Sequence, residues 1–298
     1  MVYLILSIIC SSSIALIFKY SESKDMNRFA ITMFNYVGAA ITALVMLLID
    51  FPKTGSGGHS FQEVIVESSA LFTKNSSIFW GIGIGLFAGI FFFVAFIYYQ
   101  KSVRENGVSL SGAFGKLGII VPMTLGMVLW KEIPLPLQWI GILLAIASIL
   151  LVNNPFRSSA DRIRLSLVLL FMFNGLAEFT NKLFQNYTVT GYKNIFLLSV
   201  FSSAFFISFI FYRKRKIKIK VEEVFTGLAV GLPNLFSSFF LIMALEGMKS
   251  SVVFPVFSAG SVVMISIGGF FIFREKLQRK DLVSLFMILI ALVLINIK

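Results

Sequence analysis

The chain has 298 residues, of which 57% are hydrophobic and 13% charged, and its formal net charge is +12. So apolar a composition excludes a water-soluble domain, and basic residues placed between apolar runs indicate membrane-flanking loops rather than a nucleic-acid surface. One cysteine, Cys10, and one histidine, His59, exclude an internal disulfide, a thiolate metal site and histidine catalysis. We therefore expect no cofactor, no metal and no enzyme activity.

Apolar runs separated by charged or turn-rich breaks predict an all-α integral membrane protein, because several reach the length of about 20 residues that a helix needs to cross a bilayer. A transmembrane barrel would instead show short alternating segments. The polar stretch 51–78 is interpreted as a linker. The predicted transmembrane helices are ten, at 2–19, 29–50, 79–99, 107–130, 134–152, 163–184, 194–212, 223–245, 250–273 and 281–297.

The chain resembles itself at a shift of about 145 positions. The pair Lys131 and Glu132 falls on Arg274 and Glu275 at a shift of 143, in equivalent breaks between runs. Further matches at this shift or at 146 are Phe114 with Phe257, Gly81 with Gly227, Gly85 with Gly231 and Phe93 with Phe239. The sequence therefore predicts two five-helix repeats, 1–153 and 154–298. Because five is odd, the second repeat enters the membrane in the opposite sense, as in many alternating-access transporters.

The distribution of lysine and arginine predicts the orientation. The odd-numbered loops carry eighteen of these residues, including the run RKRKIKIK at 213–220, while the even-numbered loops and the termini carry seven. Cytoplasmic loops are enriched in such residues, so the odd-numbered loops are predicted to be cytoplasmic. The chain is then expected in the cytoplasmic (inner) membrane, with both termini on its outer side. The basic run is interpreted as an anchor on anionic lipid headgroups.

These features resemble the drug/metabolite transporter superfamily, in particular its EamA-like ten-helix members. The resemblance covers nearly the whole chain outside 51–78 and is carried by GVSLSGAFGKLGIIVPMTLGMVLWKEIPLPLQWIGILLAIASILL and SVVFPVFSAGSVVMISIGGFFIFREKLQRKDLVSLFMILIALVLI. It implies a basket of helices around a central cavity and transport of small metabolites. The family's usual small residue before the acidic residue is replaced here by Lys131 and Arg274.

Lys116 stands in the predicted fourth span, where charged residues are costly and usually functional. Gly112, Gly115 and Gly118 form a small-residue stripe close to its face, which leaves room for another helix or a ligand. We expect Lys116 to bind an anionic group of a substrate; the alternative is a structural ion pair or a bond to the carbonyls of a broken helix. The aligned residue of the second repeat is Ala259.

Glu178 is the carboxylate placed well inside a predicted span, and it shares a helical face with Asn174 and Lys182. Asn174 is a candidate substrate ligand, and Glu178 is the candidate proton-coupling residue because coupling requires a buried carboxylate. The alternative is a Glu178 to Lys182 pair that neutralises itself. The estimated depths of Lys116 and Glu178 differ by roughly 10 Å, so that a direct contact requires a favourable tilt.

Two more amides, Asn35 and Asn234, are candidate substrate ligands, with interhelical hydrogen bonding as the alternative. Pro233 beside Asn234 loosens its helix, which favours a site there. Glu132 and Glu275 are predicted to be structural, because each precedes the first turn of a closing helix and can cap its amides. Pro134 suits the first position of that helix.

Together these features predict a secondary active transporter of small organic metabolites that works by alternating access. The form of transport considered is proton-coupled export. The alternative is a flippase of lipids or lipid-linked carriers on the same fold. The predicted partners are the bilayer and a small-molecule substrate, with anionic or zwitterionic metabolites weakly favoured. Substrate identity, direction of transport and oligomeric state stay open.

Overall fold

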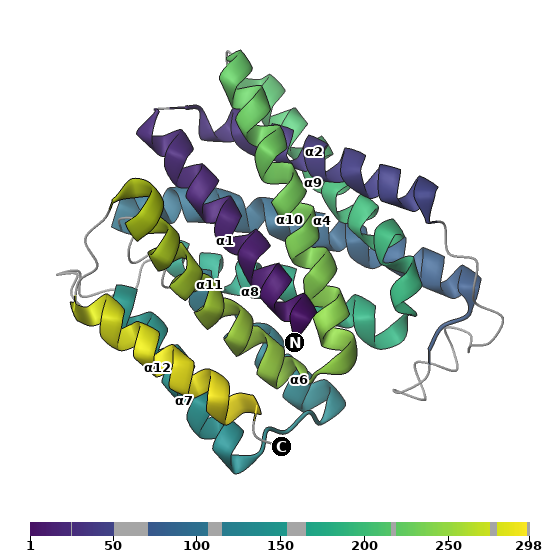
Figure 1. Ribbon diagram of the computed structural model, residues 1–298. Helices are drawn as coiled ribbons and strands as arrows, with labels where there is room; N and C mark the ends of the chain where they lie inside the picture. The colour runs from purple at the N-terminus through teal and green to yellow at the C-terminus, as the bar shows by residue number, and fades with distance from the viewer. Residues whose placement is uncertain are drawn as a thin grey trace. The chain divides into compact units, whose positions relative to one another are not determined.

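A computed structural model describes residues 1–24, 26–50, 71–106, 115–153, 165–215, 219–274 and 279–296 (Figure 1). The described residues are almost entirely α-helical, as the apolar runs predict. Seven described helices are long and apolar enough to cross a membrane, which fits a multi-pass membrane protein. Ten membrane-spanning helices are predicted, so the described residues contain fewer helices of this length and composition than predicted.

Helix boundaries follow the predicted runs closely, with two corrections. The helices are α1 (Val2–Ser23), α2 (Arg28–Ile49), α4 (Lys74–Asn106), α6 (Ile120–Trp130), α7 (Pro136–Asn153), α8 (Leu165–Tyr187), α9 (Lys193–Arg215), α10 (Val221–Gly247), α11 (Ser250–Phe273) and α12 (Arg279–Asn296). Helix α4 begins five residues earlier and ends seven residues later than predicted, so the last part of the supposed linker and the predicted break at 100–106 are helical. Helix α7 begins with Pro136 in place of Pro134, because either proline suits a first helical position.

The predicted span 107–130 differs most from the structure. Its described regular helix, α6, has only 11 residues, Ile120–Trp130. Before it, residues 115–119 form a short helical piece followed by a turn. The first eight residues of the predicted span lie outside the described residues. The described helix is therefore interrupted close to Lys116.

The helices group into two compact units, each of which draws on both predicted repeats. Unit 1 comprises residues 1–93 and 180–247, and unit 2 comprises residues 94–179 and 248–298. Helices α4 and α8 each contribute one part to either unit. The division into repeats 1–153 and 154–298 concerns sequence duplication and stays a prediction.

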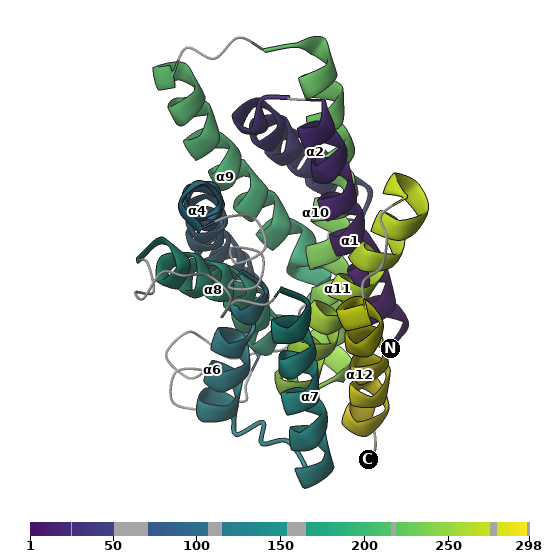
Figure 2. The same cartoon turned by 90° about the vertical axis from the view of Figure 1, so that its left-hand side faces the viewer.

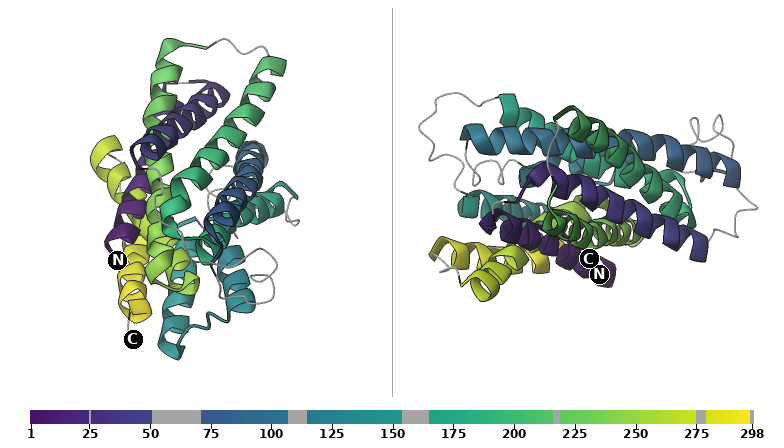
Figure 3. Two further views of the ribbon diagram at one scale, coloured as in Figure 1. Left: turned by 90° about the vertical axis from the view of Figure 1, so that its right-hand side faces the viewer. Right: turned by 90° about the horizontal axis from the view of Figure 1, so that it is seen from above.

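Unit 1 is organised around α2, which packs against both α10 and α9 (Figure 3). Glycines of α10 let the two backbones approach closely. A methyl group built on Gly231 would lie 2.6 Å from the carbonyl oxygen of Asn35 and 2.8 Å from the amide nitrogen of Ala39. Only glycine fits there, because real side-chain carbons do not approach the backbone so closely.

The same approach occurs a second time in unit 1, between α4 and α9. A methyl group on Gly85 would lie 2.8 Å from the carbonyl oxygen of Phe196 and 3.2 Å from the amide nitrogen of Val200. Phe196 and Val200 stand 161 positions after Asn35 and Ala39, and Gly231 stands 146 positions after Gly85. The same close packing thus occurs twice. In one crossing the glycine belongs to the second predicted repeat and the partner helix to the first, and in the other crossing the reverse holds.

A matching feature ends α6 and α11. Lys131 and Arg274, which the sequence aligns at a shift of 143, are the C-caps of these helices and have identical left-handed backbone angles, φ 53° and ψ 34°. Among the described residues, no other non-glycine residue has a positive φ. Left-handed caps commonly end helices, but usually with glycine. The two breaks therefore share a conformation as well as a sequence pattern.

In unit 2, α7 and α12 lie side by side (Figures 1 and 2). These helices close the two predicted repeats, and α11 contacts α6, α7 and α12. The first half of α11, residues 250–262, is buried, including Val253, Phe254 and Ser258. Helix α11 is therefore the centre of unit 2.

Replacing Gly231 by alanine should destabilise the protein by about 1 to 3 kcal/mol, because the added methyl group forces the backbones of α10 and α2 apart. Gly83→Ala is the matched control, since nothing lies within 4 Å of a methyl group there. Thermal unfolding of both variants in detergent measures the difference. Equal melting temperatures would contradict the close approach of α10 to α2.

Candidate functional site

The structure brings the predicted polar residues together in two places, one in each unit. Lys116, Asn174 and Glu178 belong to unit 2, whereas Asn35 and Asn234 belong to unit 1. Glu275 lies outside the described residues.

The interruption before α6 weakens the hydrogen bonds of two backbone carbonyls inside an apolar segment. The amide of Gly118 donates to the carbonyl of Gly115 at 3.3 Å, and the amide of Ile119 donates to that of Lys116 at 3.5 Å. These are bonds over three residues, which leave carbonyls poorly satisfied compared with a regular α-helix. Helix α6 then begins at Ile120 without a side-chain hydrogen bond to its N-cap.

Two side chains from other helices add hydrogen bonds to these weakly bonded carbonyls. Asn174 on α8 donates from Nδ2 to the Gly115 carbonyl at 2.7 Å, and Ser258 on α11 donates from Oγ to the Lys116 carbonyl at 3.2 Å. Within a membrane such partners are required, because water is not present to replace the lost helical bonds. Asn174 is therefore engaged with the backbone at this interruption.

Helix α8 lies directly against the interruption. A methyl group on Gly118 would lie 2.9 Å from the Phe171 carbonyl oxygen and 3.1 Å from the Gly175 amide nitrogen. Phe171, Asn174 and Gly175 lie on one helical face, and Glu178 occupies the next turn of the same face. The backbone contact between two glycines brings this face close to Lys116.

Lys116 itself is half-buried and lies among groups from α8 and α11. Its Nζ is 5.9 Å from the centre of the Phe257 ring, within the range of a cation–π interaction. The Glu178 carboxylate attracts it electrostatically. Helix α8 thus packs directly against the segment that carries Lys116.

Phe257 and Ser258 are residues of this site that sequence reasoning missed as ligands. The repeat alignment singled out Phe257 only as the match of Phe114. Serine and phenylalanine are common in apolar helices, so neither carries a signal of its own. Their role depends on which face of α11 contacts α6.

Lys182, the alternative partner proposed for Glu178, is 3% exposed and donates from Nζ to Gln185 Oε1 at 3.2 Å. A buried lysine requires such polar partners to offset its desolvation. Lys182 therefore has an acceptor on its own helix. Lys116, on a different segment, is attracted by the Glu178 carboxylate electrostatically.

In unit 1, Asn234 on α10 donates from Nδ2 to Oδ1 of Asn35 on α2 at 3.0 Å. This is the interhelical hydrogen bond given above as the alternative. The equivalent crossing of α4 and α9, however, packs as closely with Phe196 at the position of Asn35. This type of crossing does not need an amide pair, so the pair stays a candidate for binding a polar solute.

Glu132 caps a helix, but a different one from that expected. Its carboxylate accepts hydrogen bonds from the amide nitrogen of Ser250, at 2.7 Å, and from Ser250 Oγ, so it stands at the N-terminus of α11. The closing helix α7 is capped instead by Gln138, whose Oε1 accepts from the Leu135 amide at 3.0 Å. A carboxylate is favourable at a helix N-terminus, and the chain turn at Lys131 directs it to α11.

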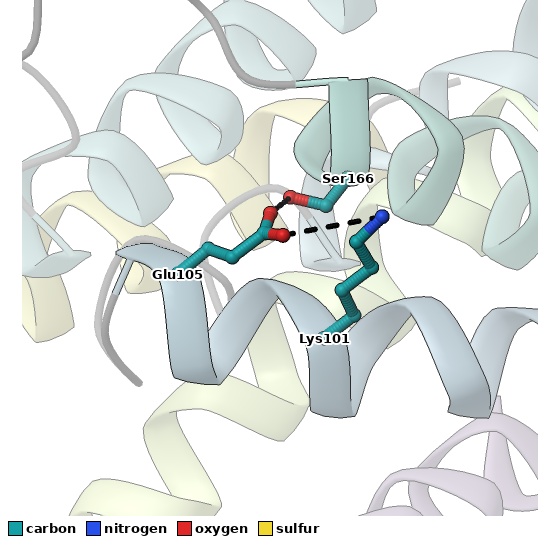
Figure 4. Close-up of polar contacts among 3 residues, drawn as sticks. All are labelled: Lys101, Glu105 and Ser166. Atoms are coloured by element: carbon teal, nitrogen blue, oxygen red, sulfur yellow. Dashed lines mark hydrogen bonds and ion pairs between the residues drawn. The ribbon is translucent and has the colours of Figure 1, made fainter.

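Two more carboxylates tie helix ends together. Glu223 is 2% exposed and accepts from the amide nitrogens of Asn27, at 2.8 Å, and Lys220, at 2.9 Å. Glu105 at the end of α4 accepts from Ser166 Oγ on α8 at 2.6 Å and lies 3.9 Å from Lys101 Nζ (Figure 4). These carboxylates act at helix termini, whereas Glu178 lies within a helix.

Comparisons with known proteins give a similar sequence and a similar solved structure, and neither description names an activity. No protein-family model matches the chain. A protein of Haemophilus influenzae (strain ATCC 51907 / DSM 11121 / KW20 / Rd), described as uncharacterized, is 24% identical over 284 residues, which are 93% of this chain and 91% of that protein. A crystal structure of a protein is similar with a TM-score of 0.70 and 12% identity, over 99% of this chain and 97% of that one. At this identity the likeness shows a shared fold alone.

Replacing Glu132 by alanine should lower the stability by about 1 to 3 kcal/mol, because the Ser250 amide and hydroxyl lose their acceptor. Glu222→Ala serves as the control: its side chain is exposed in the first turn of α10, so the change should cost less than about 1 kcal/mol. Urea or thermal unfolding in detergent compares them. A Glu132 variant as stable as the control would contradict the cap.

Proposed function

We propose that this chain is a secondary transporter of small organic metabolites. The observation that carries the proposal is the interrupted membrane helix beside Lys116. Interrupted helices whose free backbone groups and charges meet are the usual binding sites of such transporters. Intramembrane charges are retained at a cost in stability, which favours a functional role.

We further propose that the chain forms ten membrane helices in two inverted repeats. Two features support this proposal. The contacts of Gly85 with α9 and of Gly231 with α2 are equivalent, and the halves are exchanged between them. Lys131 and Arg274 share one left-handed conformation at matched breaks. An exchange of halves is what a two-fold relation between repeats requires, and such repeats accompany alternating access.

In this proposal Lys116 attracts an anionic group of the solute, and the Phe257 ring provides an apolar wall beside the ammonium group. Asn174 and Ser258 hold the interrupted backbone, so that Lys116 keeps its position. The amides of Asn35 and Asn234 are candidates for binding the uncharged polar part of a solute. Metabolites that carry a carboxylate or phosphate are therefore favoured, and the protein acts as a carrier rather than an enzyme.

We propose the cytoplasmic (inner) membrane as the location, with both termini outside. The seven apolar helices support a multi-pass membrane protein, and the excess of lysine and arginine in the odd-numbered loops supports the orientation. A reporter that is active only in the cytoplasm, fused after residue 298, should stay inactive.

The transport proposal is tested with purified protein in liposomes and a panel of labelled carboxylate and phosphate metabolites. We expect Lys116→Gln to reduce uptake at least tenfold, because the charge that attracts the anion is lost. Lys101→Gln is the matched control, since its side chain is exposed and pairs with Glu105 at the end of α4. Equal losses in both variants would remove Lys116 from the site.

The alternative is a flippase of lipids or lipid-linked carriers, in which Lys116 and the basic loop residues act on a phosphate headgroup. A fluorescent phospholipid that changes leaflet in the same liposomes, with no uptake of any water-soluble metabolite, would establish this alternative. Uptake of a soluble metabolite without lipid movement supports the transporter.

A further inference from the structure

We propose that three polar residues of unit 1, Thr32, Asn35 and Asn234, form a binding site for a carboxamide group of an uncharged solute. The site uses no residue of the group around Lys116. This inference rests on the proposed transport function, which it deepens by naming a chemical group that the solute carries.

The two amides use only part of their hydrogen-bonding capacity on each other. Asn234 Nδ2 donates to Asn35 Oδ1 at 3.0 Å, and neither side chain makes another hydrogen bond within the described part of the chain. Asn35 Nδ2 is thus left as a donor and Asn234 Oδ1 as an acceptor. A carboxamide presents the complementary groups, a carbonyl oxygen beside an N–H. It can therefore accept from Asn35 and donate to Asn234.

Thr32 supplies a third polar group at this place on α2. It precedes Asn35 by three residues, so the two side chains are neighbours on the helix surface. The Thr32 side chain is 2% exposed, and its Oγ1 has no hydrogen-bond partner among the described residues. Buried hydroxyl groups nearly always have a partner, and a polar ligand at the amide pair would provide one.

Pro233 adds a backbone acceptor beside the pair. Proline has no amide hydrogen, so within α10 the carbonyl of Ala229, four residues earlier, lacks its helical donor. That carbonyl points along the helix towards the turn that carries Asn234. Inside a membrane such a carbonyl needs a donor from elsewhere, which a carboxamide also offers.

Helix packing alone does not account for the amide pair. In the equivalent crossing of α4 and α9, Phe196 stands at the position of Asn35, and Ala88 stands 146 positions before Asn234. Phe196 and Ala88 are fully buried, and the backbones approach each other as closely as in the crossing of α2 and α10. A crossing of this kind thus forms without amides, so the pair adds a binding capacity to it.

The surroundings of the pair favour an uncharged solute group. Asn234 stands 13 residues from either end of α10, so it lies at mid-helix, the level at which transporters bind their solutes. Helix α2 has no charged residue between Arg28 and Asp50. Helix α10 has none between Glu223 and Glu246. An ionised group at the pair would find no counter-charge on these two helices, whereas a carboxamide needs only hydrogen bonds.

The first test measures ligand binding by the full-length protein in detergent. The probe is benzamide, and the controls are acetophenone and N,N-dimethylbenzamide, which keep the carbonyl group but have no N–H to donate to Asn234. Bound ligand raises the melting temperature by mass action. We expect benzamide to stabilise the wild type and both controls to bind about tenfold more weakly, because the hydrogen bond to Asn234 is lost.

Thr32→Val separates ligand binding from stability. The hydroxyl that it removes has no partner among the described residues, so the melting temperature without ligand should stay the same or rise. The affinity for benzamide should fall several-fold. Thr42→Val is the matched control on the same helix: Thr42 Oγ1 donates to the Gly38 carbonyl at 2.8 Å, and its loss should leave the affinity unchanged.

Asn234→Ala tests the amide pair itself. Alanine at position 88 of the equivalent crossing shows that the packing accepts this residue. We expect the variant to fold and to bind benzamide at least about tenfold more weakly than the wild type, because Asn234 Oδ1 no longer accepts from the ligand.

Three results would overturn the site. These are a wild type that benzamide does not stabilise, a wild type that binds N,N-dimethylbenzamide as tightly as benzamide, and an affinity that Thr32→Val and Asn234→Ala leave unchanged. The transport proposal is judged separately, by uptake of carboxylate and phosphate metabolites and its dependence on Lys116. Benzamide binding without any uptake by liposomes would overturn transport and leave the site.

Discussion

Inside a bilayer, a backbone carbonyl that leaves the helical ladder needs a partner from another helix, and this requirement organises unit 2. The interruption at 115–119 takes its partners from Asn174 on α8 and Ser258 on α11. These two bonds fix both helices against the segment that carries Lys116. The contacts that satisfy the backbone thereby also hold the Lys116 segment against the face of α8 that carries Asn174 and Glu178.

Unit 1 depends on close helix crossings that glycine makes possible. The contacts of Gly231 on α2 and of Gly85 on α9 repeat one arrangement, in which backbone atoms of the partner helix leave no room for a side chain. The two crossings pack in the same way but differ in their polar residues. Phe196 in the second crossing stands at the position that Asn35 has in the first. In the repeat alignment Ala259, 1% exposed, likewise matches Lys116. Packing residues recur between the halves, whereas the candidate functional residues do not.

The buried and partly buried glutamates differ in whether they lie at the end of a helix or within one. Glu105, Glu132 and Glu223 each accept hydrogen bonds that join the end of one helix to another segment. Helix N-termini have unsatisfied amides and a positive dipole, so the Glu132 and Glu223 carboxylates are stabilising there and need no functional explanation. Glu105, in the last turn of α4, instead accepts from the Ser166 hydroxyl at the start of α8. Glu178 lies within a helix, where neither reason applies. Helix capping therefore does not explain the position of Glu178.

The sequence by itself determined the all-helical membrane class and most helix boundaries, because runs of apolar residues between charged breaks follow from the thickness of the bilayer. It also marked the residues of interest: Lys116, Asn174 and Glu178 stand out since polar groups are costly in hydrocarbon. Only the tertiary structure decided their partners. Which helix Glu132 caps, and that Ser258 and Phe257 lie beside Lys116, depend on contacts between segments more than 100 positions apart, which the pattern along a single helix does not record.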